Sequence, residues 1–350
     1  MHRSRPRAGL RQEPTPVAAT AERLLADASR VLCIGIGGGG DVVGALAAGA
    51  LAETLGTRFE LGGLTWERRP VDPLPGPRRI DELDHAEPLH RFAALAGPRT
   101  SGPGGFRFAE SGIAGVLGRP VALLDPGGGP RGVADGILAT TERLGCDLVV
   151  LLDVGGDVLA HGDEPGLASP LADAVLLAAA PHLAAAGRSV LGAVFGTGCD
   201  GELTPAEVVD RYDEVAAAGG DLGRSALPPA VRARLVAALP HVPTEASAMA
   251  VRCALGETGR TTIRDGRRTV ELTAIGGQLL WFEPACALRS AARLAAALDG
   301  VSDLAAAQAA LSALGVRTEL DLERDAAAGE SGAGARVGDP HRVDGGGSGA

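Results

Sequence analysis

Four clusters rich in glycine and aspartate each follow an apolar run that predicts a buried strand, and this repetition constrains the fold most. The clusters are residues 35–41, 125–129, 153–157 and 196–202. Apolar runs that alternate with helical stretches are typical of a parallel sheet covered by helices. Such sheets bind ligands beyond the carboxyl ends of their strands, where glycine lets the backbone approach closely. The pattern therefore predicts one ligand site built from four loops.

The predicted fold class is α/β, with a doubly wound, mostly parallel, Rossmann-like sheet and helices on both faces. Strands are predicted at residues 31–36, 59–65, 121–124, 147–152 and 189–195, and helices at 41–56, 131–144 and 168–186. Beyond residue 200 we expect mainly helices, opened by Pro205, Pro229, Pro243 and Pro284. One β-hairpin is expected at about residues 260–273, around Asp265-Gly266.

The chain predicts a single folded domain at residues 16–324. Residues 1–15 and 325–350 are predicted to be disordered, because their composition buries too little apolar surface to fold. Residues 66–118 combine proline, glycine and charge with few apolar repeats, so we expect a long excursion over the strand ends.

Composition narrows the class of partner. A net charge of −10 without any dense basic block argues against nucleic acid, and no apolar run is long enough to span a bilayer. We expect a cytoplasmic protein with a small-molecule ligand, and a homo-oligomer remains open. The five cysteines are widely spaced and predict neither a disulfide framework nor a zinc site. Lysine is missing from the chain, which excludes a Walker lysine and a Schiff base.

The first glycine cluster matches G-x-G-x-x-G between a predicted strand and a predicted helix. Backbone N–H groups at a helix N-terminus favour an anion such as a phosphate. The alternative is a tight turn in which the aspartate complements the helix dipole. The predicted ligand contacts of this loop are Gly35, Gly37, Gly38, Gly39, Gly40 and Asp41.

Further cofactor contacts are predicted from the next two loops. A dinucleotide would need an acid at the end of the second strand, and Glu67 comes several residues late. Arg68 is a candidate phosphate clamp in a protein without lysine. The second glycine cluster adds Asp125, Gly127 and Gly128 as candidate contacts.

Paired carboxylates follow the fourth strand. Asp153 and Asp157 lie on one glycine-rich turn and can converge on Mg²⁺, which prefers oxygen ligands. Asp200 and Glu202, after the next strand, can add to the same cation, and Gly198 and Asp200 are also candidate cofactor contacts. We therefore predict Asp153, Asp157 and Asp200 as metal ligands and the first two also as catalytic residues. Helix capping by these aspartates is the structural alternative.

His161 follows the paired aspartates and is the predicted acid–base residue, because histidine titrates near neutral pH. A solvated loop histidine is the alternative. Cys199 is a poor nucleophile candidate, since the adjacent Asp200 raises its pKa.

Several motifs together resemble an uncharacterised family of domains of unknown function found in archaea and actinobacteria. They are the glycine-rich residues 35–45, Gly-Leu-Thr-Trp-Glu-Arg at 63–68, Asp-Pro-Leu-Pro-Gly-Pro at 72–77 and Leu-Asp-Val-Gly-Gly-Asp at 152–157. The likeness covers most of residues 30–315. It implies a shared single-domain fold and supplies no catalytic residues.

The first functional hypothesis is an enzyme, a transferase or hydrolase, acting on a phosphorylated or nucleotide-like small molecule. Mg²⁺ is expected at Asp153 and Asp157, and the anion at residues 37–40. The alternatives are an NAD(P)-dependent oxidoreductase and a non-catalytic nucleotide-binding or sensor module.

Overall fold

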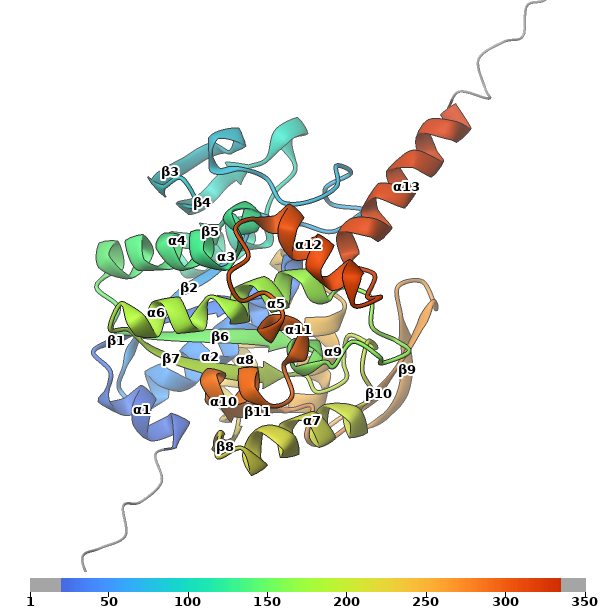
Figure 1. Ribbon diagram of the computed structural model, residues 1–350. Coiled ribbons are helices and arrows are strands. Elements are labelled where there is room, and N and C mark those ends of the chain that lie inside the picture. Colours follow the sequence, from blue (N-terminus) through green and yellow to red (C-terminus); the bar gives the residue numbers. More distant parts are fainter. Residues whose placement is uncertain (1–19, 335–350) are drawn as a thin grey trace, which may run out of the picture.

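The computed structural model describes residues 20–334, which contain a nine-stranded sheet in the order β3-β4-β5-β2-β1-β6-β7-β11-β8 (Figure 1). Its strands are β1 (Arg30–Gly35), β2 (Arg58–Leu64), β3 (Asp84–His90), β4 (Ala93–Ser101), β5 (Val121–Leu124), β6 (Leu148–Val154), β7 (Ser189–Phe195), β8 (Asp221–Ala226) and β11 (Gln278–Phe282). The central run from β5 to β7 is parallel, and the pairings outside it are antiparallel. The prediction of an α/β fold around a large parallel sheet is confirmed.

Helices cover both faces of this sheet, and each face has its own apolar core. One core includes α1 (Ala21–Asp27), α2 (Val42–Thr54), α3 (Ala109–Leu117), α8 (Pro229–Ala238) and α9 (Ala246–Ala254). The other includes α4 (Gly129–Leu144), α5 (Pro170–Ala178), α6 (Ala180–Ala185), α7 (Pro205–Ala217), α10 (Pro284–Arg289), α11 (Arg293–Ala296) and α12 (Leu304–Ala313). Every residue of β6 is buried, with Val150 in the first core and Val149 in the second. This two-sided burial explains why the strand reads as a continuous apolar run.

The order of the strands determines where a ligand can bind. From β1 the chain adds β2 and then β5 on one side, returns through α4, and adds β6 and β7 on the other side. The connections therefore diverge between β1 and β6, and ligands of open α/β sheets bind at such switch points, beyond the carboxyl ends of the strands.

Two predictions about the edges of the sheet are wrong. Residues 66–118 are not simply an excursion, because they include β3, β4 and α3, and β3 and β4 extend the sheet beyond β5. Beyond residue 200, the β-hairpin is accompanied by two further strands, because β8 and β11 join the main sheet. The predicted hairpin is confirmed as β9 (Gly259–Ile263) and β10 (Arg268–Leu272).

The C-terminal boundary of the folded domain differs from the prediction. Helix α13 (Glu319–Gly334) continues past residue 324, so residues 325–334 are helical rather than disordered. The predicted helix at 168–186 is divided into α5 and α6. The other predicted disordered segments, residues 1–15 and 335–350, lie outside the described residues. Among residues 20–334, no helix has the length and apolar character required to cross a membrane.

Candidate functional site

Six acidic side chains meet at the carboxyl ends of β1, β6 and β7, and we call them the carboxylate site. They form two groups, in each of which one oxygen per residue lies within 4.8 Å of the others. The first group is Asp41, Asp153 and Asp173, and the second is Asp157, Asp200 and Glu202. All six are buried, and the most exposed of them is only 9% accessible. Each group has the ligand type and spacing that a divalent cation requires.

Each of these side chains is placed by a loop or helix at the switch point. Asp41 ends the turn after β1, Asp153 lies near the end of β6, and Asp173 lies on α5. Asp157 begins the short helix after β6, and the remaining two acids follow β7. The structure divides the three predicted metal ligands between the two groups, with Asp153 in the first and Asp157 and Asp200 in the second, rather than placing them around one cation.

Burial and the mutual repulsion of the carboxylates disfavour the ionised form of the acids in the carboxylate site. Burial raises the pKa of both Asp41 and Asp200 to about 7. Burial, followed by the charges of neighbouring acids, holds the pKa values of Asp153, Asp157 and Asp173 well above their ordinary range. The neighbours that act on Asp153 belong to both groups, so the two groups form one continuous site. Such a site must hold protons or cations.

Two arginines offset part of this charge. Arg268 of β10 pairs with Glu202 at 3.1 Å, and the charge of Arg68 lowers the pKa of Asp41, partly opposing the effect of burial. Of the buried oxygens that have no hydrogen-bond partner among the described residues, two belong to the carboxylate site, Oδ1 of Asp173 and Oδ1 of Asp200. Because buried polar atoms are nearly always hydrogen-bonded, these two oxygens are available to a proton or a cation.

Glycines in the two loops give the carboxylates room. A Cβ atom on Gly37 would stand 2.7 Å from Oδ2 of Asp41 and 3.2 Å from Oδ2 of Asp173. A Cβ atom on Gly155, which has φ +140, would overlap the carboxylate of Asp200. Only glycine fits at these close approaches.

The glycine loop after β1 is largely committed to internal contacts. Gly37 N–H donates to Oδ2 of Asp41 at 3.0 Å, and Gly39 N–H donates to the carbonyl of Trp66 at 3.1 Å. Side chains at Gly35, Gly38 or Gly40 would collide with neighbouring atoms. These contacts favour the tight-turn interpretation, because the loop already binds an anion of its own, the carboxylate of Asp41.

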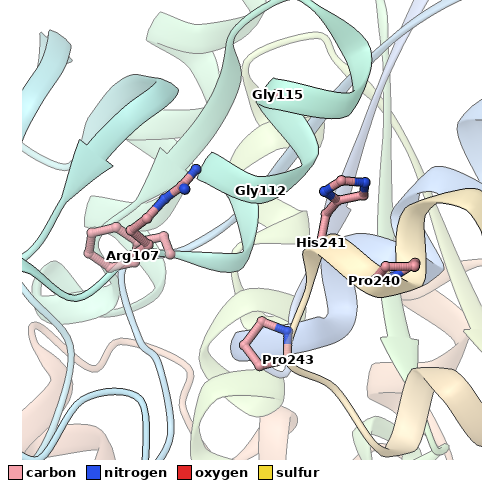
Figure 2. A pocket seen from close by; sticks show the side chains of 7 residues that line it. Arg107, Gly112, Gly115, Pro240, His241 and Pro243 are labelled. Carbon is pink, nitrogen blue, oxygen red and sulfur yellow. The ribbon is translucent and has the colours of Figure 1, made fainter.

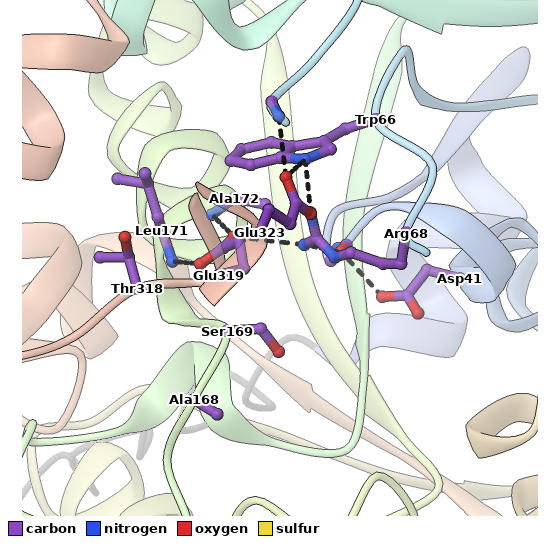
Figure 3. A network of polar contacts seen from close by, with 12 residues as sticks. Asp41, Trp66, Arg68, Ala168, Ser169, Leu171, Ala172, Thr318, Glu319 and Glu323 are labelled. Carbon is purple, nitrogen blue, oxygen red and sulfur yellow. Dashed lines mark hydrogen bonds and ion pairs between the residues drawn. The ribbon is translucent and has the colours of Figure 1, made fainter. Parts of the chain in front are cut away.

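Arg68 is held by the C-terminal helix rather than left open for a ligand (Figure 3). Its guanidinium pairs with Glu319 at 3.2 Å and Glu323 at 3.6 Å, both on α13, and lies 4.6 Å from the ring centre of Trp66. It also donates to the carbonyl of Gly37 at 2.8 Å. The start of α13 therefore closes one side of the carboxylate site.

The other predicted cofactor contacts serve local structure. Glu67 accepts the N–H of Ala109 at 2.6 Å, at the start of α3, and burial raises its pKa to about 7. Asp125 accepts the N–H of Gly127 at 2.7 Å and caps the turn after β5. Gly128 packs against Phe92. Since β5 is separated from β6 by β2 and β1, this turn is not part of the carboxylate site.

His161 and the cysteine candidate have partners outside the carboxylate site. His161 Nε2 lies 2.9 Å from Glu214 of α7, which also pairs with Arg211. The Sγ atoms of Cys199 and Cys253 are 3.7 Å apart and both side chains are buried. The hydrogen bond with Cys253, burial and the charge of Asp200 raise the pKa of Cys199, which disfavours a nucleophile. Gly198, with φ +74, packs against Pro205 and donates to the carbonyl of Gly155.

Sequence reasoning missed Asp173, Glu319 and the arginines of the hairpin. Asp173 had a usable signal, because it is the one charged residue in the apolar segment 170–181. A single acid in such a segment indicates a buried functional group. The contacts of Glu319 with Arg68 span 251 positions in sequence and left no local signal.

Two cavities help to locate access to the site. One of about 470 Å³ lies between the loop after β7 and the β9–β10 hairpin, and Glu202 and Arg260 line it. The other, of about 370 Å³, lies between α3 and residues 240–243 and is lined by Arg107 and His241 (Figure 2). None of the predicted site residues lines the second cavity, so the first is the candidate entrance.

Comparison with known proteins agrees with the resemblance seen in the motifs. No curated protein and no solved structure matches this chain. A family described as a protein of unknown function, DUF1152, matches residues 32–327, which include all six acids of the carboxylate site. The chain belongs to the DUF1152 family.

Proposed function

We propose that the carboxylate site binds divalent cations, Mg²⁺ first, and that the protein uses them as a transferase or hydrolase acting on a phosphorylated or nucleotide-like small molecule. The observation that carries the proposal is the pair of unpartnered oxygens on Asp173 and Asp200 within six buried carboxylates. Mg²⁺ is held by one or two carboxylates and keeps waters and substrate phosphates as its remaining ligands.

The location supports a catalytic role for a bound cation. The site lies at the switch point of the sheet, where ligands of open α/β folds bind. A cation there would neutralise phosphate oxygens and lower the pKa of a bound water. With two groups of three carboxylates, the site has donors for one cation in each group.

The NAD(P) alternative receives less support from the contacts. The N–H groups of Gly37 and Gly39 are already hydrogen-bonded, and one oxygen of Glu67 caps α3. Dinucleotide binding at a glycine loop uses backbone N–H groups and an acid for the ribose. A sensor module remains an outcome of the experiment, recognised by binding without turnover.

A thermal-shift experiment with Mg²⁺ or Mn²⁺ at neutral pH tests the proposal, because a ligand that binds only the folded state raises the Tm. The wild-type Tm should rise, and in Asp173→Asn the rise should be smaller although the protein folds, because only the second group keeps its three carboxylates. Asp173 is the clearest position, because its Oδ1 has no partner to lose among the described residues. Asp135→Asn, on the exposed side of α4, is the matched control and should respond as the wild type does.

Two further outcomes decide the class of function. Nucleotides and sugar phosphates added with Mg²⁺ should raise the Tm further, and product formation distinguishes an enzyme from a sensor. An unchanged wild-type Tm with every cation and ligand would reject the proposal, and an equal rise in Asp173→Asn would move the cation elsewhere.

A further inference from the structure

The turn of the β9–β10 hairpin has an unusual backbone at Arg264. Arg267 N–H donates to the carbonyl of Arg264 at 3.1 Å across Asp265 and Gly266, whose φ angles are 54 and 79. These two residues form the centre of a type I′ turn, as Asp-Gly predicts. Arg264 precedes them and also has a positive φ, 55, which costs an L-residue roughly 1–2 kcal/mol.

This backbone is fixed by a partner from another element. The carboxylate of Glu245, at the start of α9, accepts the N–H of Arg264 at 2.5 Å. The strained conformation at Arg264 is therefore maintained by tertiary contacts. Strain of this kind is concentrated at ligand-binding and catalytic sites.

The hairpin places Arg264 at the carboxylate site. Arg268, the first residue of β10, donates to the carbonyl of Asp200 at 3.2 Å and pairs with Glu202. The charges of Arg268, Glu202, Asp200 and Arg68 all act on the pKa of Arg264, after burial, which lowers it. Arg264 is half-buried, and it directly follows Ile263, the residue that pairs with Arg268 in the hairpin.

Three arginines whose charges act on Asp41 or Asp200 differ in one respect. Arg68 pairs with Glu319 and Glu323, and Arg268 pairs with Glu202. In contrast, the guanidinium of Arg264 has no hydrogen bond or ion pair with any residue between 20 and 334. Its five N–H donors are available to an anion, and the planar guanidinium binds phosphate with two parallel hydrogen bonds.

We propose that Arg264 binds a phosphate group of the ligand directly, on the side of that phosphate opposite the cation. This inference rests on the proposed function and makes it more specific, because it assigns a ligand that carries phosphate and binds together with its cation. Six carboxylates alone would repel such a ligand, and a cation on one side with an unpaired guanidinium on the other would hold it. Arg264 takes over the anion-binding role that the sequence assigned to the glycine loop and to Arg68.

Calorimetric titration of the full chain with inorganic pyrophosphate, with and without Mg²⁺, tests this assignment. Arg264→Gly removes the guanidinium while suiting the positive φ, so the turn should be retained. We expect Arg264→Gly to weaken pyrophosphate binding about tenfold or more, with or without Mg²⁺, wherever the wild type binds pyrophosphate. The affinity for Mg²⁺ in the absence of pyrophosphate should not change. Arg267→Gln is the matched control in the same turn, because the Arg267 side chain is 77% exposed, and it should change affinity less than about twofold.

The outcomes separate the two proposals. If Mg²⁺ binds but Arg264→Gly binds pyrophosphate as tightly as the wild type, or the wild type binds no pyrophosphate, the role of Arg264 is rejected and the cation site stands. If Mg²⁺ does not bind the wild type, the proposed function fails. In that case a tenfold loss in Arg264→Gly without Mg²⁺ would still support the anion contact.

Discussion

The cation-free protein is expected to lose stability as the pH rises from about 5.5 to about 8, by about 2 kcal/mol or more. Folding raises the pKa of Asp41 and of Asp200 from the ordinary value of 3.8 to about 7. Between those values the folded state binds more protons than the unfolded chain, so stability must fall with increasing pH. The stabilising effect is complete below about pH 4 and is lost as the pH passes about 7.

Calorimetric unfolding with a chelator present, at a series of pH values, measures this effect. Acids whose pKa is lowered by folding, such as Asp221 and Asp321, titrate below this range and do not disturb it. Mg²⁺ should remove the part of the loss that comes from Asp41 and Asp200, because a cation replaces their protons, and should leave the part that comes from Glu67, whose pKa burial also raises to about 7. Asp173→Asn should flatten the profile, and a wild-type stability that is constant or increasing across this range would contradict the expected ionisation of the site.

Replacing Glu319 by alanine is expected to destabilise the protein by about 3 kcal/mol. The carboxylate is 3% exposed, accepts the N–H groups of Leu171 and Ala172 at 3.0 and 2.8 Å, and pairs with Arg68. Its removal leaves two N–H groups at the start of α5 without an acceptor and weakens the neutralisation of Arg68. Chemical denaturation of wild type and variant measures the difference.

The control lies on the same helix. Asp325 pairs with Arg317, but their side chains are 73% and 62% exposed, so Asp325→Ala should cost less than about 1 kcal/mol. If Glu319→Ala and Asp325→Ala lowered the free energy of unfolding equally, the buried contacts of Glu319 with α5 and Arg68 would contribute no more than an exposed ion pair. The stabilising role assigned to Glu319 would then be rejected.

The parts of the fold that are governed by local patterns were predictable. Strands β1, β5, β6 and β7 are apolar runs that end at or next to glycine or aspartate, and the structure places them and β2 within one or two residues of the predicted bounds. By contrast, β8 is an edge strand in which only Ser225 is fully buried, and it carries no apolar periodicity. Strand β11 had a signal in Leu279 to Phe282, a short apolar run that sequence alone does not distinguish from a helix.

The site was predictable only where its residues follow strands directly. Asp153, Asp157 and Asp200 come from strand-end loops, and neighbouring parallel strands bring such loops together. The position of Arg264 depends on a backbone conformation with positive φ, and sequence predicts this conformation only where the residue is glycine. Glu319 depends on the packing of α13, which is determined by distant contacts.

Titration calorimetry of Mg²⁺ binding, repeated in two buffers of different ionisation enthalpy at about pH 7, tests the central claim most directly. If the carboxylate site holds the cation, binding must displace protons from the carboxyls whose pKa lies near 7, namely Asp41 and Asp200. We expect saturable binding that releases protons in the wild type, and fewer bound cations with less proton release in Asp173→Asn, which keeps only the second group intact. Binding without proton release, or with equal release in Asp173→Asn, would contradict the assignment of a cation to these six carboxylates.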